Sequence, residues 1–161
     1  MKFNEDKFRL DGKIALITGA GREIGADIVL DPELGGSALR EKIFSLTSEI
    51  GADIVIDCAG IPDTFKESLS LCKRGGQVIV VGISEKPFVY NPVKLIMKEI
   101  EMIGSLGYND KFTEVIELLS RGMIKTDLFI SEVIPLSDII DKGFNRLKPP
   151  SDVIKILVRP H

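Results

Sequence analysis

A glycine-rich turn near the amino terminus has the residue types and spacing to bind a phosphate group. Residues 11–25 read DGKIALITGAGREIG, in which an apolar run leads into the glycines. Backbone N–H groups at Gly19 and Gly21 would approach a pyrophosphate closely, and Gly25 would let a following helix pack tightly. Arg22 either contacts the 2′-phosphate of NADP or is an exposed arginine in a turn. The turn therefore makes Gly19, Gly21 and Gly25 candidate binding residues for NAD or NADP.

Metal and disulfide chemistry have few residues to draw on. The chain has two cysteines, Cys58 and Cys72, and one histidine, His161, at its last position. A zinc site needs four nitrogen, sulfur or oxygen ligands, most often from Cys and His. The sequence therefore predicts neither a zinc site of that kind nor a disulfide framework.

Short β-branched runs alternate with longer amphipathic runs, and these elements must position any such site. The strand-like runs are KIALIT (13–18), ADIVL (26–30), ADIVID (52–57), QVIVVG (77–82), IEMIG (100–104), FISEVI (129–134) and VIKILV (153–158). Helical periodicity covers residues 37–50, 62–72, 109–121 and 136–147. Several strands are almost wholly apolar, which is typical of strands covered on both faces. The pattern predicts one Rossmann-like α/β domain over residues 1–161, with a mostly parallel sheet and helices on both faces.

The composition argues against several classes of protein. The 161 residues suit one domain, and their net charge of −3 leaves no basic footprint for nucleic acid. No apolar run approaches the roughly 18 residues of a membrane span. The charged start MKFNEDKFRLDGK is unlike a secretory signal. We therefore expect a cytoplasmic protein whose partners include neither nucleic acid nor a membrane.

Two parts of the chain resemble two different families of dehydrogenase. Residues 1–25 resemble the opening of short-chain dehydrogenases, whose turn reads T-G-x-x-x-G-x-G. Thr18, Gly19 and Gly25 match that turn, whereas Glu23 stands in place of a glycine. From residue 25 to about 160 the chain is similar to the cofactor-binding half of zinc-type medium-chain alcohol and polyol dehydrogenases. The segments that carry this resemblance are GADIVLDPEL, SEIGADIVIDCAGIPDTFKESLSLCKRGGQVIVVGIS, KEIEMIGSLGYNDKFTEVIELLSRGMI and IKILVRP.

The longer resemblance implies an NAD(P)-binding oxidoreductase domain of Rossmann type. It also implies a homodimer joined through the edge strand near residues 129–134. In these families the loop that corresponds to DCAG has small residues that let the cofactor pass, which points to Cys58 and Ala59. The backbone groups that face the nicotinamide correspond to Gly82 and Ile83.

Two departures from the medium-chain family bear on activity. The family's catalytic domain, which carries the zinc ligands, has no counterpart in these residues. Its second strand ends in an acid about 20 residues past the glycines that binds the adenosine ribose. Asp31 lies only six residues past Gly25, so this acid has no counterpart either. We therefore expect no zinc, weak or absent NAD(P) binding, and little or no turnover by the chain alone.

The direction of the first strand decides whether the glycine turn can meet a cofactor. If 26–30 is a strand, as its repeated GADIV motif suggests, it runs parallel to 52–57. The seven-residue turn 19–25 then makes strand 13–18 antiparallel to both, because it is too short for a crossover. The turn would lie at the amino edge of the sheet, whereas ligands bind at the carboxyl edge. The alternative makes 22–30 a short helix; we favour the hairpin.

The sequence is also compatible with two other functions. Tyr90 and Lys94 have the Y-x-x-x-K spacing of short-chain dehydrogenases, in which the lysine helps the tyrosine to donate a proton, although Pro92 lies between them. A small short-chain-type reductase is therefore one alternative. A non-catalytic dimerising module, or an engineered or recombined fusion, is another.

Overall fold

The computed structural model describes residues 9–19, 26–31, 36–85, 87–108, 110–148 and 151–160. The chain divides into two compact units. The sheet unit comprises Met1–Gly21 and Asp27–Asn109, and the C-terminal unit comprises Arg22–Ala26 and Asp110–His161.

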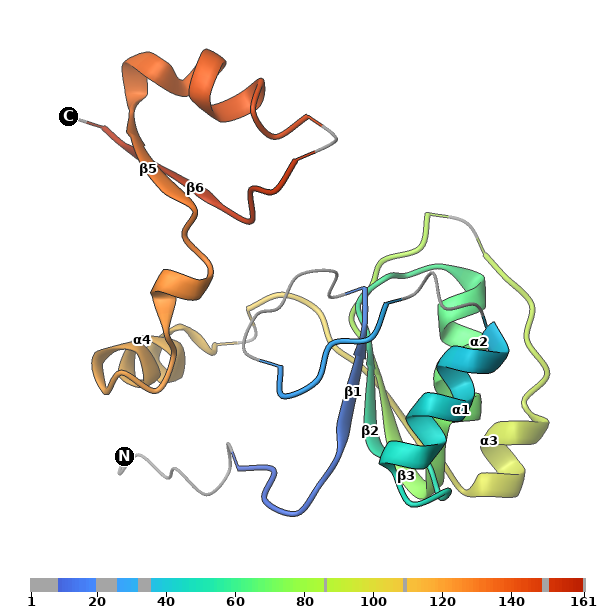
Figure 1. Ribbon diagram of the computed structural model, residues 1–161. Helices are drawn as coiled ribbons and strands as arrows, with labels where there is room; N and C mark the ends of the chain where they lie inside the picture. Colours follow the sequence, from blue (N-terminus) through green and yellow to red (C-terminus); the bar gives the residue numbers. More distant parts are fainter. Residues whose placement is uncertain are drawn as a thin grey trace. The chain divides into compact units, whose positions relative to one another are not determined.

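The sheet unit is built on a four-stranded parallel sheet. Its strands are β1 (Ala15–Thr18), β2 (Ala52–Asp57), β3 (Cys72–Val80) and β4 (Glu101–Gly104), and they lie in that order across the sheet. The helices between them are α1 (Gly36–Leu46), α2 (Pro62–Leu71) and α3 (Val93–Lys98), and Figure 1 shows all three on the same side of the sheet. The predicted α/β class with a mostly parallel sheet is confirmed. Helices were expected on both faces, whereas the described helices of this unit all lie on one face.

The core of the sheet unit lies between the sheet and α2. Val55 and Val78 stand opposite each other on β2 and β3, and both are fully buried. Leu69 of α2 belongs to the same core cluster and is 2% exposed. Phe65 of α2 meets Tyr90 edge-on, with ring centroids 5.1 Å apart. Because burying a leucine contributes roughly 1.5–3 kcal/mol, α2 is anchored to the sheet mainly through this apolar face.

The first strand runs parallel to its neighbour, so the expected hairpin is wrong. β1 pairs with β2 in parallel register, with Ala15 opposite Ile54 and Thr18 opposite Asp57. Residues 26–31 form neither the expected strand nor the alternative helix. Among the described residues, α1 is then the one regular element between the two strands, and a single returning helix makes the strands parallel. The expectation failed because it counted 26–30 as a strand, which reversed the inferred direction of β1.

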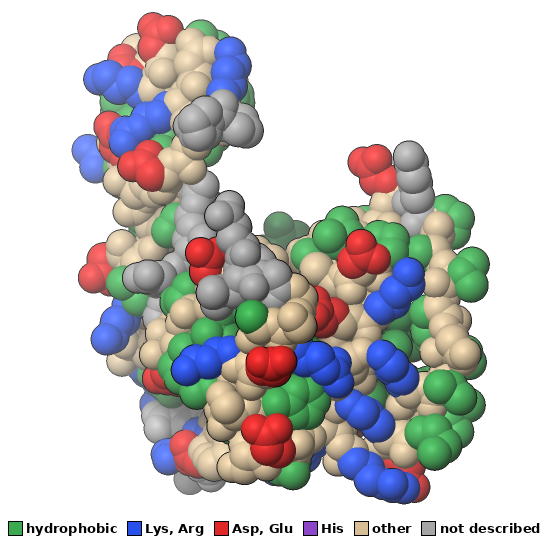
Figure 2. Space-filling view, turned by 45° about the vertical axis from the view of Figure 1, so that its right-hand side comes forward, with side chains coloured by type: hydrophobic (Ala, Val, Ile, Leu, Met, Phe, Trp, Pro, Cys, Tyr) green, Lys and Arg blue, Asp and Glu red, His purple; other side chains and the backbone are tan. Residues whose placement is uncertain are grey.

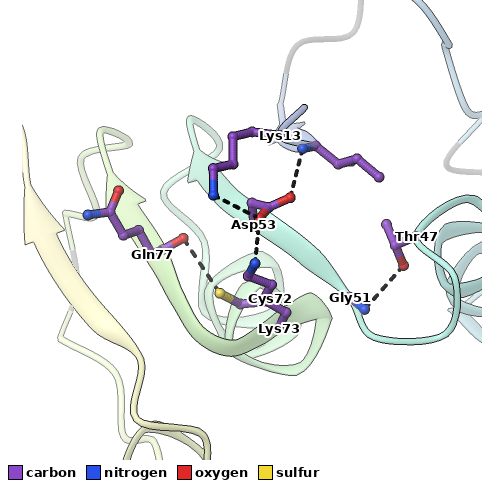
Figure 3. A network of polar contacts seen from close by, with 8 residues as sticks. Lys13, Thr47, Gly51, Asp53, Cys72, Lys73 and Gln77 are labelled. Atoms are coloured by element: carbon purple, nitrogen blue, oxygen red, sulfur yellow. Dashed lines mark hydrogen bonds and ion pairs between the residues drawn. The ribbon is translucent and has the colours of Figure 1, made fainter. Parts of the chain in front are cut away.

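An aspartate of β2 joins neighbouring strands at the amino edge of the sheet (Figure 3). Asp53 accepts a hydrogen bond from the Ile14 backbone N–H at 2.9 Å. Its carboxylate also lies 2.5 Å from Nζ of Lys73 and 3.7 Å from Nζ of Lys13. The Lys73 hydrogen bond is the largest of the contacts that lower the pKa of Asp53. Asp53 therefore helps to fix the register of β1 against β2 and β3.

The face of the sheet away from the three helices carries a row of isoleucines. The parallel register aligns Ile17, Ile56, Ile79 and Ile103 across the strands. Ile17 is 48% exposed and Ile103 is 37% exposed. Because side chains alternate along a strand, this row points away from the buried Val55 and Val78.

The C-terminal unit contains a second, smaller sheet. Its elements are α4 (Phe112–Ser120), a 3₁₀ helix (Thr126–Leu128), β5 (Glu132–Pro135), a second 3₁₀ helix (Leu136–Asp138), a π-helix (Ile139–Phe144) and β6 (Ile156–Arg159). β5 and β6 pair in parallel, and Ile134 of β5 is 1% exposed. The regular helix expected over 136–147 is thus replaced by a 3₁₀ turn and a π-helix. Gly143 lies close to Ile134, since an added Cβ would stand 3.5 Å from its Cδ1.

The surface mixes charged and apolar groups. Figure 2 shows Lys, Arg, Asp and Glu side chains interspersed with hydrophobic ones on the face that it draws. Val89, Leu106 and Ile83 are the most exposed large hydrophobic residues described, at 90%, 78% and 77%. Within the described ranges, no helix combines the length and apolarity that a membrane span requires.

Candidate functional site

Three neighbouring strands end at one edge of the sheet, and the residues that follow them form the candidate site. We define the carboxyl edge as residues 18–19 at the end of β1, 57–60 at the end of β2 and 81–83 after β3. In open parallel sheets, ligands bind outside the carboxyl ends of the strands. The parallel direction of β1 therefore places Gly19 at the edge where a cofactor can bind.

The loops of the carboxyl edge pack against one another through their backbones. A Cβ on Gly19, whose φ is +74°, would lie 2.8 Å from the backbone N of Ala59. A Cβ on Gly82 would lie 2.6 Å from Cα of Gly60. Gly60 itself has a φ of +67°, and a Cβ there would lie 2.9 Å from the backbone N of Ile83. These contacts account for the glycines by internal packing, and they bring the ends of β1, β2 and β3 within van der Waals contact.

A buried carboxylate stands at the centre of the carboxyl edge. Asp57, the last residue of β2, is 1% exposed. Its Oδ1 accepts hydrogen bonds from Oγ1 of Thr18 at 2.8 Å and from Oγ1 of Thr64 at 3.0 Å. The backbone N–H of Ala59 donates to the same oxygen at 3.2 Å. The side chain therefore joins β1, the loop after β2 and the first turn of α2.

The main chain of Asp57 extends this connection to β3. Its carbonyl oxygen accepts hydrogen bonds from the N–H groups of Val81 at 2.9 Å and Gly82 at 2.8 Å. The Cys58 N–H donates to the Thr18 carbonyl at 3.2 Å. Sequence reasoning did not select Asp57 or Gly60, although both belong to the DCAG motif. The hydroxyls of Thr18 and Thr64 on either side of the motif were the available signal for Asp57.

The predicted cofactor residues fall into two groups. Gly19, Cys58, Ala59, Gly82 and Ile83 all lie at the carboxyl edge, so the structure brings these five together. Within this group, Ile83 is 77% exposed and presents an apolar side chain. The other predicted residues of the glycine turn, 21 and 25, lie outside the described residues, as does residue 22. Their roles stay predictions.

The two cysteines lie at opposite edges of the parallel sheet, so they cannot bind the same metal ion. Cys58 follows β2 at the carboxyl edge and is exposed, whereas Cys72 begins β3 at the amino edge and is fully buried. Burial raises the pKa of Cys58, and the charge of Asp57 raises it further. The Sγ of Cys72 donates to the Gln77 carbonyl at 3.6 Å. The described part of the chain contains no group of three or more His, Cys, Asp or Glu residues that could hold a metal ion.

The Tyr90 and Lys94 pair lies in a different place. Both residues line a cavity of about 420 Å³ together with Lys66, Leu69 and Val93. Nζ of Lys94 donates to Oγ of Ser70 in the last turn of α2. Because α2 leads from the end of β2 to the start of β3, its last turn lies toward the amino edge. The ammonium group is therefore held away from the carboxyl edge, and the arrangement does not favour a reductase that uses this pair.

A family model described as zinc-binding dehydrogenase matches residues 19–121. Among curated proteins, (R,R)-butanediol dehydrogenase of Bacillus subtilis is 31% identical over 139 residues, covering 86% of this chain and 39% of the relative. The crystal structure of 2R,3R-butanediol dehydrogenase from Bacillus subtilis superposes with a TM-score of 0.75 at 29% identity, covering 83% of this chain and 38% of that one. The chain thus spans about two fifths of the length of this relative.

Two similar solved structures contain a nicotinamide cofactor. A short chain alcohol dehydrogenase from E. coli, in complex with NADH, has a TM-score of 0.71 at 25% identity, covering 83% of this chain and 39% of that one. A zinc-binding dehydrogenase from Sinorhizobium meliloti, bound to NADP, has a TM-score of 0.72 at 26% identity, covering 92% of this chain and 45% of that one.

Proposed function

Because this chain belongs to the zinc-binding dehydrogenase family, we propose that its carboxyl edge binds NAD(H) or NADP(H) weakly. The chain is an alcohol- and polyol-dehydrogenase-like domain. The observation that carries the proposal is the set of adjacent strand ends, where the backbones of Gly19, Ala59 and Gly82 meet at the ligand-binding edge of a parallel sheet.

The described residues supply one half of a dinucleotide site. A full Rossmann sheet has the strand order 3-2-1-4-5-6, and the dinucleotide crosses it where strands 1 and 4 meet. The order β1-β2-β3-β4 corresponds to strands 1-4-5-6. Strand 2, which ends in the acid that binds the adenosine ribose, has no counterpart among the described strands. We therefore infer binding of the nicotinamide half and expect the adenosine half to contribute little.

The residues of the carboxyl edge would bind and orient the cofactor. A bound nicotinamide would supply hydride transfer chemistry. Ile83 would offer its exposed side chain to the ring, and the backbone of Gly82 would lie beside it. The pKa of the Cys58 thiol is raised, so it would be mostly protonated at neutral pH and is not assigned a catalytic role.

We further propose that these residues alone turn over little or no alcohol or polyol. Catalytic zinc in proteins is held by three protein ligands that converge on one point. The described residues bring no such set together.

We also propose that the protein is cytoplasmic and forms a homodimer through residues 129–134. The dimer is supported by β5 (Glu132–Pro135), which has β6 as its one partner among the described strands.

Calorimetric titration with NADH and NADPH tests the cofactor proposal. We expect a dissociation constant on the order of 0.1–1 mM, or about −4 to −5.5 kcal/mol. Ile83→Asp should weaken binding roughly fivefold, about 1 kcal/mol. Ile96→Asp is the matched control, because Ile96 is 67% exposed but lies on α3.

Four results would contradict these proposals. An absence of binding at millimolar NADH and NADPH, or equal affinities for the two variants, would exclude the carboxyl edge as the site. Low-micromolar affinity would refute the weak-binding claim. Steady hydride transfer from butane-2,3-diol or sorbitol to NAD(P) would refute the absence of turnover.

A further inference from the structure

Asp57 occupies a position where an apolar residue would be expected from its surroundings. It lies on the side of β2 that faces α2, two residues from the buried Val55. A carboxylate is costly to bury unless hydrogen bonds satisfy it. The hydrogen bonds that Asp57 accepts therefore account for its place here.

We propose that Asp57 is the positioning residue of the carboxyl edge, whose buried carboxylate holds Thr18, Ala59 and Thr64 in the arrangement that accepts a cofactor. This inference rests on the proposed function, because it assigns to that site the residue that shapes it. Asp57 itself is buried beneath the loops, so it acts through the backbones around it.

The geometry shows how one side chain can set three segments. Oδ1 receives the Thr18 hydroxyl from the end of β1, the Ala59 N–H from the following loop and the Thr64 hydroxyl from α2. The Thr64 hydroxyl also lies 3.1 Å from the carbonyl oxygen of Ile61. The two hydroxyls and the Ala59 N–H converge on one oxygen, so they tie their segments to a common point, which apolar packing alone would not do.

The same residue transmits this restriction to the proposed nicotinamide side. The Asp57 carbonyl accepts the N–H groups of Val81 and Gly82. Gly82 in turn packs on Gly60, so the loops after β2 and β3 cannot move independently. A shift of Asp57 would therefore displace Ile83, the exposed residue that we place against the cofactor.

Two substitutions of Asp57 separate positioning from stability. Asp57→Leu removes every side-chain acceptor, whereas Asp57→Asn keeps the shape and one acceptor oxygen. Thr64→Val deletes a single donor at the rim and serves if Asp57→Leu fails to fold. Leu69→Ala is the control, because Leu69 is 2% exposed in the core and lies near the C-terminal end of α2, whereas Thr64 lies in its first turn.

Two properties are measured: the affinity for NADH, and how rigidly the loops of the carboxyl edge are held in the absence of cofactor. We expect Asp57→Leu to weaken NADH binding about tenfold and Asp57→Asn to restore most of it. Leu69→Ala should lower the unfolding midpoint more than Thr64→Val while leaving NADH affinity within about twofold. Equal affinity losses in Leu69→Ala and Asp57→Leu, at temperatures where both are folded, would reduce Asp57 to a stability residue.

Measurements without cofactor keep this test separate from that of the proposed function. Amide hydrogen exchange at Ala59 and Gly82, and iodoacetamide labelling of Cys58, should become faster in Asp57→Leu and stay unchanged in Leu69→Ala. If the unchanged protein binds no NADH, the proposed function fails, but these rates still test whether Asp57 orders the edge. Unchanged rates in both Asp57→Leu and Thr64→Val would overturn the inference.

Discussion

Gly82→Ala and Gly104→Ala form a matched pair, because each adds one methyl group near the carboxyl end of a strand in the same sheet. At Gly82 the new Cβ would lie 2.6 Å from Cα of Gly60 and 2.9 Å from the carbonyl carbon of Ala59. Backbone atoms do not approach a Cβ this closely, so the loops must separate by roughly 1 Å, and overpacking of this kind costs about 1–3 kcal/mol. At Gly104 nothing lies within 4 Å, so the same methyl should change stability by less than about 0.5 kcal/mol.

Thermal and urea unfolding measure this difference. For a chain of this size each kcal/mol lowers the thermal midpoint by about 2–4 °C, so we expect Gly82→Ala to lose roughly 2–12 °C. Gly104→Ala should stay within about 2 °C of the unchanged protein. Equal midpoints for the two variants would refute the claim that the loops after β2 and β3 are in backbone contact.

Three further changes test other parts of the molecule. Asp53 has a pKa below its ordinary value of 3.8, so its contacts stabilise the fold above about pH 4 and are lost as the pH falls through the folded-state pKa. Between about pH 5 and pH 2.5, the free energy of unfolding measured in urea should therefore fall less for Asp53→Asn than for the unchanged protein, by up to about 1 kcal/mol. Parallel pH profiles of the two proteins would contradict this. Nζ of Lys98 donates to the carbonyls of Ser70 and Cys72, both at 2.7 Å. Lys98→Met should therefore cost about 1–3 kcal/mol in thermal unfolding, and an unchanged midpoint would show that water replaces the ammonium group. Val133, which is 49% exposed on β5, lies in the proposed dimer edge. Light scattering should show a dimer that Val133→Lys dissociates, and a monomeric parent protein would exclude that interface.

The strands were the most predictable part of the fold. ADIVID coincides with β2, because a short apolar run rich in β-branched residues favours a strand. The direction of β1 was not predictable from local composition. ADIVL at 26–30 has nearly the same residues as the start of β2, yet it forms no strand. Nearly identical residues therefore form a strand at one place in this fold and none at the other, so local composition does not decide the outcome.

The sequence predicted which loops form the candidate site, but it did not predict the side-chain hydrogen bonds that join them. Glycines and alanines after apolar runs indicated Gly19, Ala59 and Gly82, because small residues at strand ends signal close backbone approach. Asp57 was missed because its partners, Thr18 and Thr64, come from other elements. Only the parallel register brings Thr18 opposite Asp57. Side-chain networks of this kind follow from the tertiary arrangement, which single-sequence periodicity does not encode.

Protection of Cys58 by cofactor tests the central claim most directly. Cys58 is exposed at the carboxyl edge, while Cys72 is fully buried and provides an internal reference in the same chain. We predict that millimolar NADH or NADPH slows iodoacetamide labelling of Cys58, as measured by mass spectrometry, and leaves Cys72 unlabelled. A labelling rate of Cys58 that neither cofactor changes, at any concentration up to several millimolar, would contradict cofactor binding at the carboxyl edge.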